Sequence, residues 1–305
     1  MTRIGFMSDL HLDSNQFGEA ERIQLLQVLQ EEQIEHLHLA GDISNDFKQI
    51  SLPFIQDLQR QFPVSFNLGN HDMLSLSEEE IKQYDFQVQT FGDSHLVSLA
   101  GWYDYSFVPE KSKETHLCTK NTFWFDRRLE RPFDDPTITQ EVLFRLDQLL
   151  ASLDGRIIVA LHFVPHKDFL VSHPYFQKFN AFLGSQAFHD LFVKHEVADV
   201  VFGHLHHRHP SRVIDGIHYH MRPLGYIREW KLTEDFFKAY PQYKIPHMYR
   251  LHKRYNSVKK LPEFHQYKRQ HLANEFRQAL TILDCKKEKD FDPTGNRNLF
   301  FVKVA

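Results

Sequence analysis

The chain has 305 residues, which allows one large domain or two smaller ones. Hydrophobic residues make up 42% of it and charged residues 25%, the composition of an ordinary soluble globular protein. The formal net charge of −4 argues against a surface that generally coats nucleic acid.

Cysteine content and the N-terminal sequence bear on the compartment. The two cysteines, Cys118 and Cys285, imply no disulfide framework, so we expect a reducing compartment. The apolar run at the start of the chain is too short for a signal peptide, and polar residues follow it too soon. No apolar run approaches the roughly 18–20 residues of a membrane span. We therefore expect a cytoplasmic protein.

The first part of the chain alternates apolar runs with amphipathic segments. The expected strands are 4–7, 36–40 and 63–68, and the expected helices are 19–33, 47–61 and 77–84. Pro53 lies inside the second helix and can mark its true start. Strands that alternate with helices predict a parallel sheet covered by helices.

From residue 95 the pattern changes. Two strand-like runs, 95–100 and 102–107, follow each other without a helix, so we expect them to pair. Residues 108–136 read as a long irregular insertion rich in charges and aromatics, and such loops are usually functional or disordered. The remaining expected elements are a helix at 139–153, a strand at 156–161, an aromatic loop at 163–183, a helix at 185–195, a strand at 199–202 and a hairpin at 212–219.

The C-terminal region from 228 has a different composition. Between residues 231 and 277 there are eleven Lys or Arg against four Asp or Glu, with many aromatics. We expect one domain over 1–227 and a mostly helical extension over 228–305, with a last strand at 298–304 that can occupy a sheet edge. The extension can be a plain helical cap, a lid that favours small substrates or a strip for nucleic-acid phosphates; the negative net charge ranks the strip last.

Five apolar runs each end in side chains that can bind metal ions. These side chains are Asp9 and His11, Asp42, Asn70 and His71, His162, and His204 and His206. Sites in open α/β sheets form at the carboxyl ends of strands, so we expect these groups on one rim. Each residue alone has a plainer structural explanation, but five coincidences at strand ends favour a metal site. The other histidines are expected to be surface or supporting groups, because the site is complete without them.

The ligand set predicts which metals bind and how many. Oxygen and imidazole together favour manganese, with iron, zinc, cobalt or nickel as alternatives, over magnesium or calcium alone. Seven ligands, which are these side chains without His71, suit two ions that share a carboxylate, and Asp42 is the natural bridge because it follows a central strand. Two ions about 3.5–4 Å apart can activate a bridging water and clamp an in-line displacement at phosphorus.

The order Asp-x-His, Gly-Asp, Gly-Asn-His-Asp, His and Gly-His-x-His resembles the calcineurin-like metallophosphoesterase superfamily, over about residues 4–220. The resemblance implies a four-layer α/β/β/α sandwich of two mixed sheets flanked by helices. It also implies the ligand sets. Asp9, His11, Asp42 and His206 would hold one metal, and Asp42, Asn70, His162 and His204 would hold the other.

The resemblance further implies a hydrolytic mechanism. A metal-bridging hydroxide would attack phosphorus while His71 protonates the leaving oxygen, and Asp72 would orient His71. The sequence departs from the family pattern in two places. Asn45 stands where the family often has an acidic residue, and Arg222-Pro223-Leu224-Gly225 replaces the more usual Asn-Pro-Gly-Ser-like turn at the edge of the substrate site.

We therefore expect a metal-dependent phosphoesterase whose substrate is a small phosphoester, with a lean toward diesters. A nuclease acting on DNA or RNA is one alternative. A non-catalytic metal-containing binding scaffold is another, although no ligand of the family pattern is missing from the sequence.

Overall fold

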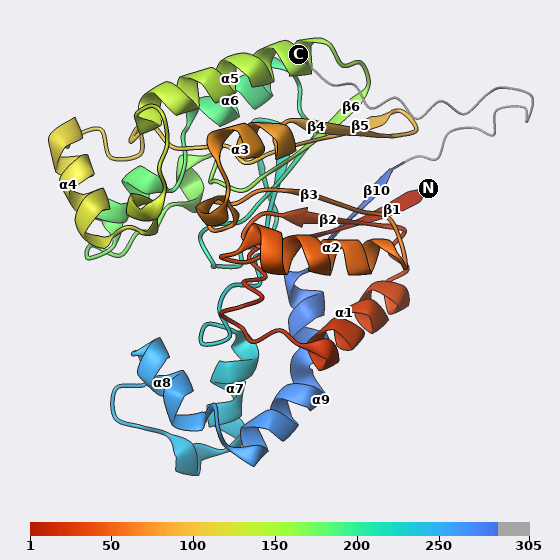
Figure 1. Cartoon of the computed structure of the whole chain (residues 1–305), viewed down its shortest axis with the longest axis vertical. Coiled ribbons are helices and arrows are strands. Elements are labelled where there is room, and N and C mark those ends of the chain that lie inside the picture. Colours follow the sequence, from red (N-terminus) through yellow and green to blue (C-terminus); the bar gives the residue numbers. More distant parts are fainter. Residues whose placement is uncertain (286–305) are drawn as a thin grey trace, which may run out of the picture.

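The computed structural model describes residues 1–285, in which ten strands form two facing sheets (Figure 1). The smaller sheet has the order β10-β1-β2-β3. Its strands are β1 (Thr2–Met7), β2 (His36–Ala40), β3 (Val64–Asn67) and β10 (Thr281–Cys285). β1, β2 and β3 run parallel, with Phe6 opposite His38, while β10 is antiparallel to β1. The carboxyl ends of three parallel strands therefore meet at one edge.

The larger sheet has the order β4-β5-β6-β7-β9-β8. Its strands are β4 (Gln87–Phe91), β5 (Ser94–Leu99), β6 (Arg156–Leu161), β7 (Asp199–Phe202), β8 (Arg212–Ile214) and β9 (Ile217–Met221). β5, β6, β7 and β9 are parallel, and β4 and β8 are antiparallel edges. Both sheets are mixed, which confirms the predicted architecture.

Helices cover the outer faces of both sheets. The helices are α1 (Glu19–Glu31), α2 (Leu52–Gln59), α3 (Glu78–Tyr84), α4 (Lys113–Phe123), α5 (Asp135–Ala151), α6 (Ala187–Lys194), α7 (Lys231–Ala239), α8 (Leu251–Val258) and α9 (Pro262–Ala279). In Figure 1, α5 and α6 lie over the larger sheet, and α1 and α2 lie over the smaller one. A single turn of π-helix, Phe47–Ser51, precedes α2, so Pro53 stands in its first turn as expected. The two sheets and their helices form the four layers.

The space between the sheets is filled by apolar side chains from both. Ile4 and Phe6 of β1 pack there with side chains of the larger sheet such as Leu96 and Ile158. Burial of these side chains stabilises the fold by about 1.5–3 kcal/mol each.

Two histidines of β2 are buried in the same interlayer, where the sequence predicted no special environment. His38 Nδ1 lies 2.8 Å from Ser65 Oγ and its Nε2 lies 2.9 Å from Asn67 Oδ1. His36 Nε2 lies 2.7 Å from the same hydroxyl. Burial lowers the pKa of His38 to about 3 and that of His36 to about 4, so both rings are neutral at pH 7.

We expect this pair to make stability depend on pH. The unfolded chain takes up a proton at the ordinary histidine pKa of 6.5, whereas folded His38 does not until about pH 3, so stability falls as the pH drops below 6.5. Between pH 7.5 and 5.0 the loss from His38 should be about 2 kcal/mol. Urea unfolding in EDTA at both pH values should show a smaller loss for His38→Gln. Exposed His252→Gln serves as the control, and equal losses in wild type and His38→Gln would contradict the prediction.

The expected pairing of strands 95–100 and 102–107 is wrong. β5 pairs instead with β4, a strand the sequence analysis missed, in register Val88 to Val97. Residues 102–107 leave the sheet because their aromatic side chains turn to a buried carboxylate. Trp102 Nε1 donates to Asp135 at 2.9 Å, and the Tyr105 hydroxyl donates to the same carboxylate.

The insertion at 108–136 is more regular than predicted. It contains α4 and a short 3-10 helix, Phe125–Arg128. Ser112 caps α4 by accepting a hydrogen bond from the Thr115 N–H, a signal that is visible in the sequence. Trp124, at the end of α4, packs on Phe182 of the loop after β6, so two aromatic segments far apart in the chain form one wall.

The C-terminal region is mostly helical up to Ala279, as predicted, and projects as a lobe of α7, α8 and α9 (Figure 1). The chain then returns to the body of the molecule as β10, next to β1. The strand predicted at 298–304 lies outside the described residues. The proposed domain boundary at 227/228 stays a prediction.

Candidate metal centre

The predicted ligands follow the carboxyl ends of five strands. β1, β2, β3, β6 and β7 end at Met7, Ala40, Asn67, Leu161 and Phe202, and each is followed within four residues by its polar group. Since these strands end at the same rim of the two facing sheets, the structure brings all seven predicted ligands and His71 together. They form two clusters that share one carboxylate.

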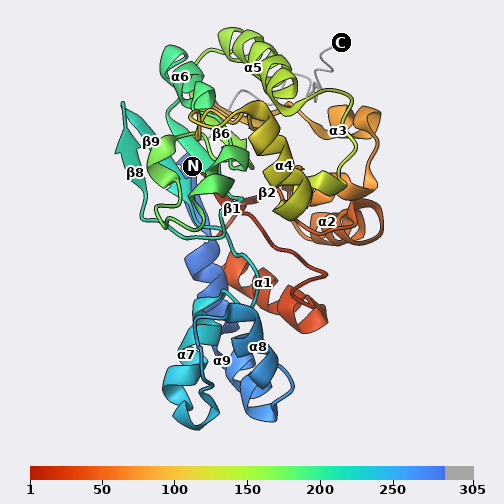
Figure 2. The same ribbon diagram turned by 90° about the vertical axis from the view of Figure 1, so that its left-hand side faces the viewer.

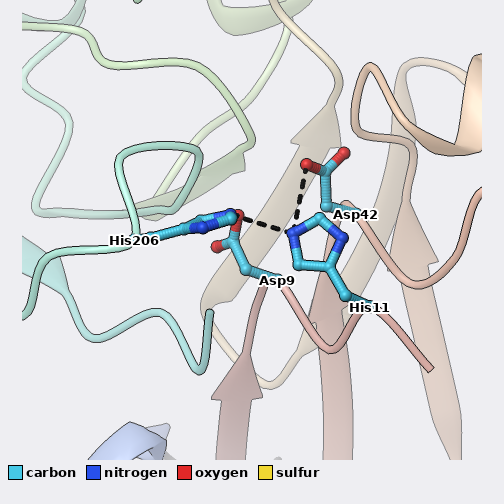
Figure 3. Close-up of side chains that lie close together, drawn as sticks. All are labelled: Asp9, His11, Asp42 and His206. Atoms are coloured by element: carbon cyan, nitrogen blue, oxygen red, sulfur yellow. Dashed lines mark hydrogen bonds and ion pairs between the residues drawn. The ribbon is translucent and has the colours of Figure 1, made fainter. Parts of the chain in front are cut away.

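The first cluster contains Asp9, His11, Asp42 and His206 (Figure 3). The Nε2 atoms of His11 and His206 face each other at 2.9 Å. His206 Nε2 is 3.2 Å from Asp9 Oδ1, and His11 Nε2 is 3.8 Å from Asp42 Oδ2. Two imidazole nitrogens and two carboxylates thus converge on one point.

The second cluster is formed by Asp42, Asn70, His162 and His204. His162 Nε2 lies 3.3 Å from Asp42 Oδ2, 3.2 Å from Asn70 Oδ1 and 3.2 Å from His204 Nδ1. Asp42 Oδ2 therefore faces His11 on one side and His162 on the other. This is the position that a bridging ligand requires.

The outer ring nitrogens have partners that fix the tautomers. His162 Nδ1 contacts the Ala40 carbonyl at 3.2 Å, and His204 Nε2 contacts the Phe182 carbonyl at 3.3 Å. A carbonyl only accepts, so each of these nitrogens carries the hydrogen and the opposite nitrogen presents its lone pair to the cluster. This arrangement is usual for metal-bound histidines, so the residues fit transition-metal ions.

Several site residues have left-handed backbone conformations. The φ angle is 58° at Asp9, 42° at His11, 53° at Asp42, 70° at His204 and 53° at His206. Non-glycine residues rarely adopt such angles, and they persist where the surroundings compensate the strain. The turns at the strand ends are thus shaped to aim these side chains.

Two glycines leave room for the carboxylates. A Cβ atom on Gly69 would lie 2.1 Å from Asp42 Oδ1, and one on Gly203 would lie 2.2 Å from Asp9 Oδ2. Any side chain at either position would displace a candidate ligand. This explains in physical terms why Gly precedes Asn70 and His204 in the motifs.

The electrostatics of the clusters keep the carboxylates ionised. Burial opposes the charge on Asp42, but the nearby His162 and His71 outweigh it and hold its pKa well below the usual value. Burial likewise opposes charge on His206, yet the hydrogen bonds that its ring donates to Asp9 and Glu229 raise its pKa to about 10. The ionised carboxylates are thus matched by positive charge on the histidines, and a bound cation would take the place of those protons.

His71 stands between the two clusters and has partners of its own. Its backbone N–H donates to Asp42 Oδ1 at 2.9 Å, and its Nε2 lies 3.9 Å from Asp42 Oδ2. Its Nδ1 lies 2.8 Å from Asn45 Oδ1, and its ring stacks on Phe125 with the centroids 3.7 Å apart. The Nδ1–H therefore points to Asn45, and Nε2 faces the shared carboxylate.

The prediction that Asp72 orients His71 is wrong. The Asp72 carboxylate accepts the backbone N–H groups of Ile43, Ser44 and Gly69 at 2.9–3.2 Å, so it braces the two turns instead. Asn45, which departs from the family pattern, takes the orienting place. An amide oxygen accepts the Nδ1 hydrogen as a carboxylate would, but it brings no negative charge.

Asp126 is a supporting residue that sequence reasoning missed. Asn70 Nδ2 donates to its Oδ1 at 2.7 Å, and Trp124 Nε1 donates to its Oδ2 at 3.0 Å. Because the carboxylate takes the amide nitrogen, the Asn70 oxygen must face His162 and the second cluster. Asp126 lies in the insertion at 108–136, and no motif marked it.

We expect Asp126→Leu to weaken metal binding at the second cluster by about 10–100-fold, since the Asn70 amide can then turn its nitrogen inward. Calorimetric titration of metal-stripped protein with Mn²⁺ measures the loss site by site. Asp134→Leu, a carboxylate of the same insertion that caps α5, is the control, because it changes stability but not the ligands. Unchanged affinity in Asp126→Leu would contradict the orienting role.

The turn after β9 closes the first cluster. Leu224 and Gly225 donate backbone hydrogen bonds to the carbonyls of Ser8 and Asp9, each at 3.0 Å. Glu229 Oε2 lies 3.0 Å from His206 Nδ1, a second supporting carboxylate that the sequence did not reveal. The Arg222–Gly225 turn thus borders the first cluster, and its place at the edge of the substrate site stays a prediction.

The chain is similar to a known protein family and, in its fold, to solved structures. A sequence model described as calcineurin-like phosphoesterase matches residues 2–208. No curated protein matched the sequence. Among solved structures, the phosphopantetheinyl hydrolase of Mycobacterium tuberculosis is similar with a TM-score of 0.59 and 20% identity, covering 75% of this chain and 92% of that one. A dimetal phosphatase of Danio rerio gives a TM-score of 0.47 and 16% identity, and the match covers 74% of this chain and 88% of that one.

Two facing mixed sheets with paired Asp and His clusters at the strand ends define a hydrolase that acts on phosphoesters. The chain belongs to the calcineurin-like phosphoesterase family. Within the described residues, no helix has the length and apolar character needed to cross a membrane.

Proposed function

We propose that the protein is a dinuclear-metal phosphoesterase. Asp9, His11, Asp42 and His206 hold one ion. Asp42, Asn70, His162 and His204 hold the other. The observation that carries the proposal is the position of Asp42 Oδ2, which lies 3.8 Å from His11 Nε2 and 3.3 Å from His162 Nε2. The mixed nitrogen and oxygen donor set suits first-row transition metals, and we propose manganese as the first ion to test, with iron, zinc, cobalt and nickel after it.

The residues of the chain bind and orient the substrate for hydrolysis. When bound, the two ions supply an activated water and offset the charge that grows on the phosphoryl oxygens. Asn45 accepts the Nδ1 hydrogen of His71 and Nε2 faces the shared carboxylate, so in the imidazolium form the proton on Nε2 is placed for transfer to the leaving oxygen. Phe125 stacks on His71 and fixes its plane.

We favour a phosphodiester as substrate. A single histidine acid, His71, protonates one leaving oxygen, and this arrangement suits an esterified phosphate. The free cysteines Cys118 and Cys285 support a reducing, cytoplasmic location.

The test is hydrolysis of bis-p-nitrophenyl phosphate and p-nitrophenyl phosphate by metal-stripped protein refilled with Mn²⁺, with metal counted on the same sample. We expect about two ions per chain and faster turnover of the diester. Two ions without turnover of either ester would favour a binding scaffold. Failure to bind two ions would overturn the proposal.

A nuclease is the second candidate, because one observation favours it. Residues 236–262 contain seven Lys or Arg and no Asp or Glu. They include α8, which lies on the same side of the molecule as α4, the side toward which β2 and β3 run (Figures 1 and 2). Oligonucleotide binding that weakens steeply with salt, and weakens less steeply in Lys253→Gln, would support this candidate.

A further inference from the structure

Two aromatic rings flank the metal centre and contact its histidines. Tyr226, in the turn after β9, stacks on His11 with the centroids 4.3 Å apart and the planes at 21°. The guanidinium carbon of Arg228 lies 3.8 Å from the centroid of the same Tyr226 ring. Both groups are at stacking distance, so they must occupy opposite faces of the ring. The Tyr226 ring thus lies between the Arg228 guanidinium group and His11, a candidate metal ligand.

The other side of the centre repeats this arrangement. Phe125 stacks on His71 with the planes at 17°, and the guanidinium carbon of Arg128 lies 5.0 Å from the Phe125 centroid. Phe125 and Arg128 belong to the short helix of the insertion, while Tyr226 and Arg228 lead into the helical lobe. Two regions outside the metal motifs therefore each place a cation beside the centre.

Both guanidinium groups have donors to spare. The Arg228 side chain is 34% exposed, and its ion pair with Glu229 Oε1, at 3.5 Å, engages a single terminal nitrogen and leaves the other N–H groups of the guanidinium available. Arg128 is exposed and forms no ion pair with any residue in 1–285. A buried arginine of α8, Arg254, donates to the Arg228 carbonyl at 2.9 Å and so anchors that segment.

We propose that the substrate carries a second phosphate group beside the scissile one, and that Arg228, on the Tyr226 side of the centre, binds it; Arg128, on the Phe125 side, offers a second position of the same kind. The planar guanidinium group can donate two parallel N–H hydrogen bonds to two oxygens of one phosphate. Stacking on an aromatic ring uses only its faces, so the N–H groups at its edge stay free for these bonds. The two cations lie beyond the rings that line the centre, so they meet a group adjacent to the reacting phosphorus and not the phosphorus itself. The inference rests on the proposed phosphoesterase function and names its substrate class.

A matched pair of substrates tests the proposal. The first is the p-nitrophenyl ester of thymidine 5′-phosphate, and the second is the same ester with a 3′-phosphate. We expect the manganese-filled protein to show a kcat/KM about tenfold higher for the ester with the 3′-phosphate. Thymidine 3′,5′-bisphosphate should also bind about tenfold more tightly than thymidine 5′-phosphate in calorimetric titrations, a measurement that needs no turnover.

Variants then assign the preference to residues. The ratio of the two kcat/KM values should fall toward one in Arg228→Gln combined with Arg128→Gln. Arg228→Lys keeps the charge without the fork and should retain only part of the ratio. Arg250→Gln is the matched control, because Arg250 also lies over an exposed tyrosine ring but belongs to the lobe. Metal content near two ions per chain shows that each variant is folded at the centre.

The outcomes separate this inference from the proposed function. Turnover of both esters with equal kcat/KM would overturn the second phosphate site. A preference that survives the double substitution would overturn its assignment to these arginines. No turnover by metal-filled protein would count against the proposed function. In that case the calorimetric preference for the bisphosphate, and its loss in the double variant, would still support or overturn the inference.

Discussion

Asp42→Asn should abolish phosphoester hydrolysis and remove most of the bound metal. Among residues 1–285, Asp42 is the one carboxylate common to both clusters, and the substitution removes its negative charge while nearly keeping its shape. The backbone N–H of His71 also donates to Asp42 Oδ1, so the change disturbs the proposed proton donor as well. We expect a loss in kcat of at least about a thousandfold, with fewer than one ion per chain by elemental analysis.

The control for this experiment is Asp57→Asn. Asp57 pairs with Arg22 and Arg60 on the surface, so the same chemical change there should leave metal content and turnover near those of wild type. If Asp42→Asn kept two ions per chain, Asp42 would not be the bridging ligand.

His71→Gln should leave both ions in place and slow the reaction according to the leaving group. A general acid contributes about 10²–10⁴-fold when the leaving oxygen is basic, and little when it is already stable. The variant should therefore lose far more activity on a phenyl or alkyl ester than on a p-nitrophenyl ester. Metal counting on the same samples separates this effect from ligand loss.

Asn45→Leu provides the companion measurement. Removal of the amide oxygen that accepts the His71 Nδ1 hydrogen should shift the leaving-group dependence in the same direction but by less, because Phe125 still holds the ring. If His71→Gln cost the same factor on every ester, the residue would bind the phosphoryl group without donating a proton.

The sequence predicted well which side chains meet at the rim, because the motifs obey a local rule. Each candidate ligand follows an apolar run directly, and parallel strands bring their carboxyl ends to one edge regardless of what lies between them. Glycine beside Asp42, Asn70 and His204 added a second local signal. The two clusters could therefore be predicted without knowledge of how the intervening segments fold.

The supporting residues could not be predicted in this way. Asp126 reaches Asn70 from an insertion 56 residues later, and Glu229 reaches His206 from the turn after β9. Their roles depend on tertiary contacts, and a lone carboxylate in a polar segment carries no periodic signal. The position of Asn45 did draw attention, but its partner became clear only from the 2.8 Å contact with His71.

The error at residues 102–107 has a similar cause. Aromatic residues such as Trp102 and Tyr105 favour a strand. In the structure, however, the Trp102 indole N–H and the Tyr105 hydroxyl both donate to the buried Asp135 carboxylate, and residues 102–107 lie outside the sheet. β4 was overlooked because Gln87–Phe91 is polar and lies at a sheet edge, where alternation is weak.

The position of β10 has a consequence for the order in which the molecule assembles during synthesis. β1 carries Asp9 and His11 at its end, yet its partner strand, Thr281–Cys285, is translated nearly 280 residues later. Until then β1 presents an unpaired edge on the ribosome, which is the kind of surface that nascent chains must protect from aggregation. Asp9 and His11, the first candidate ligands to be translated, would thus be among the last to reach their final positions. The smaller sheet would be complete only once the whole helical lobe has left the ribosome.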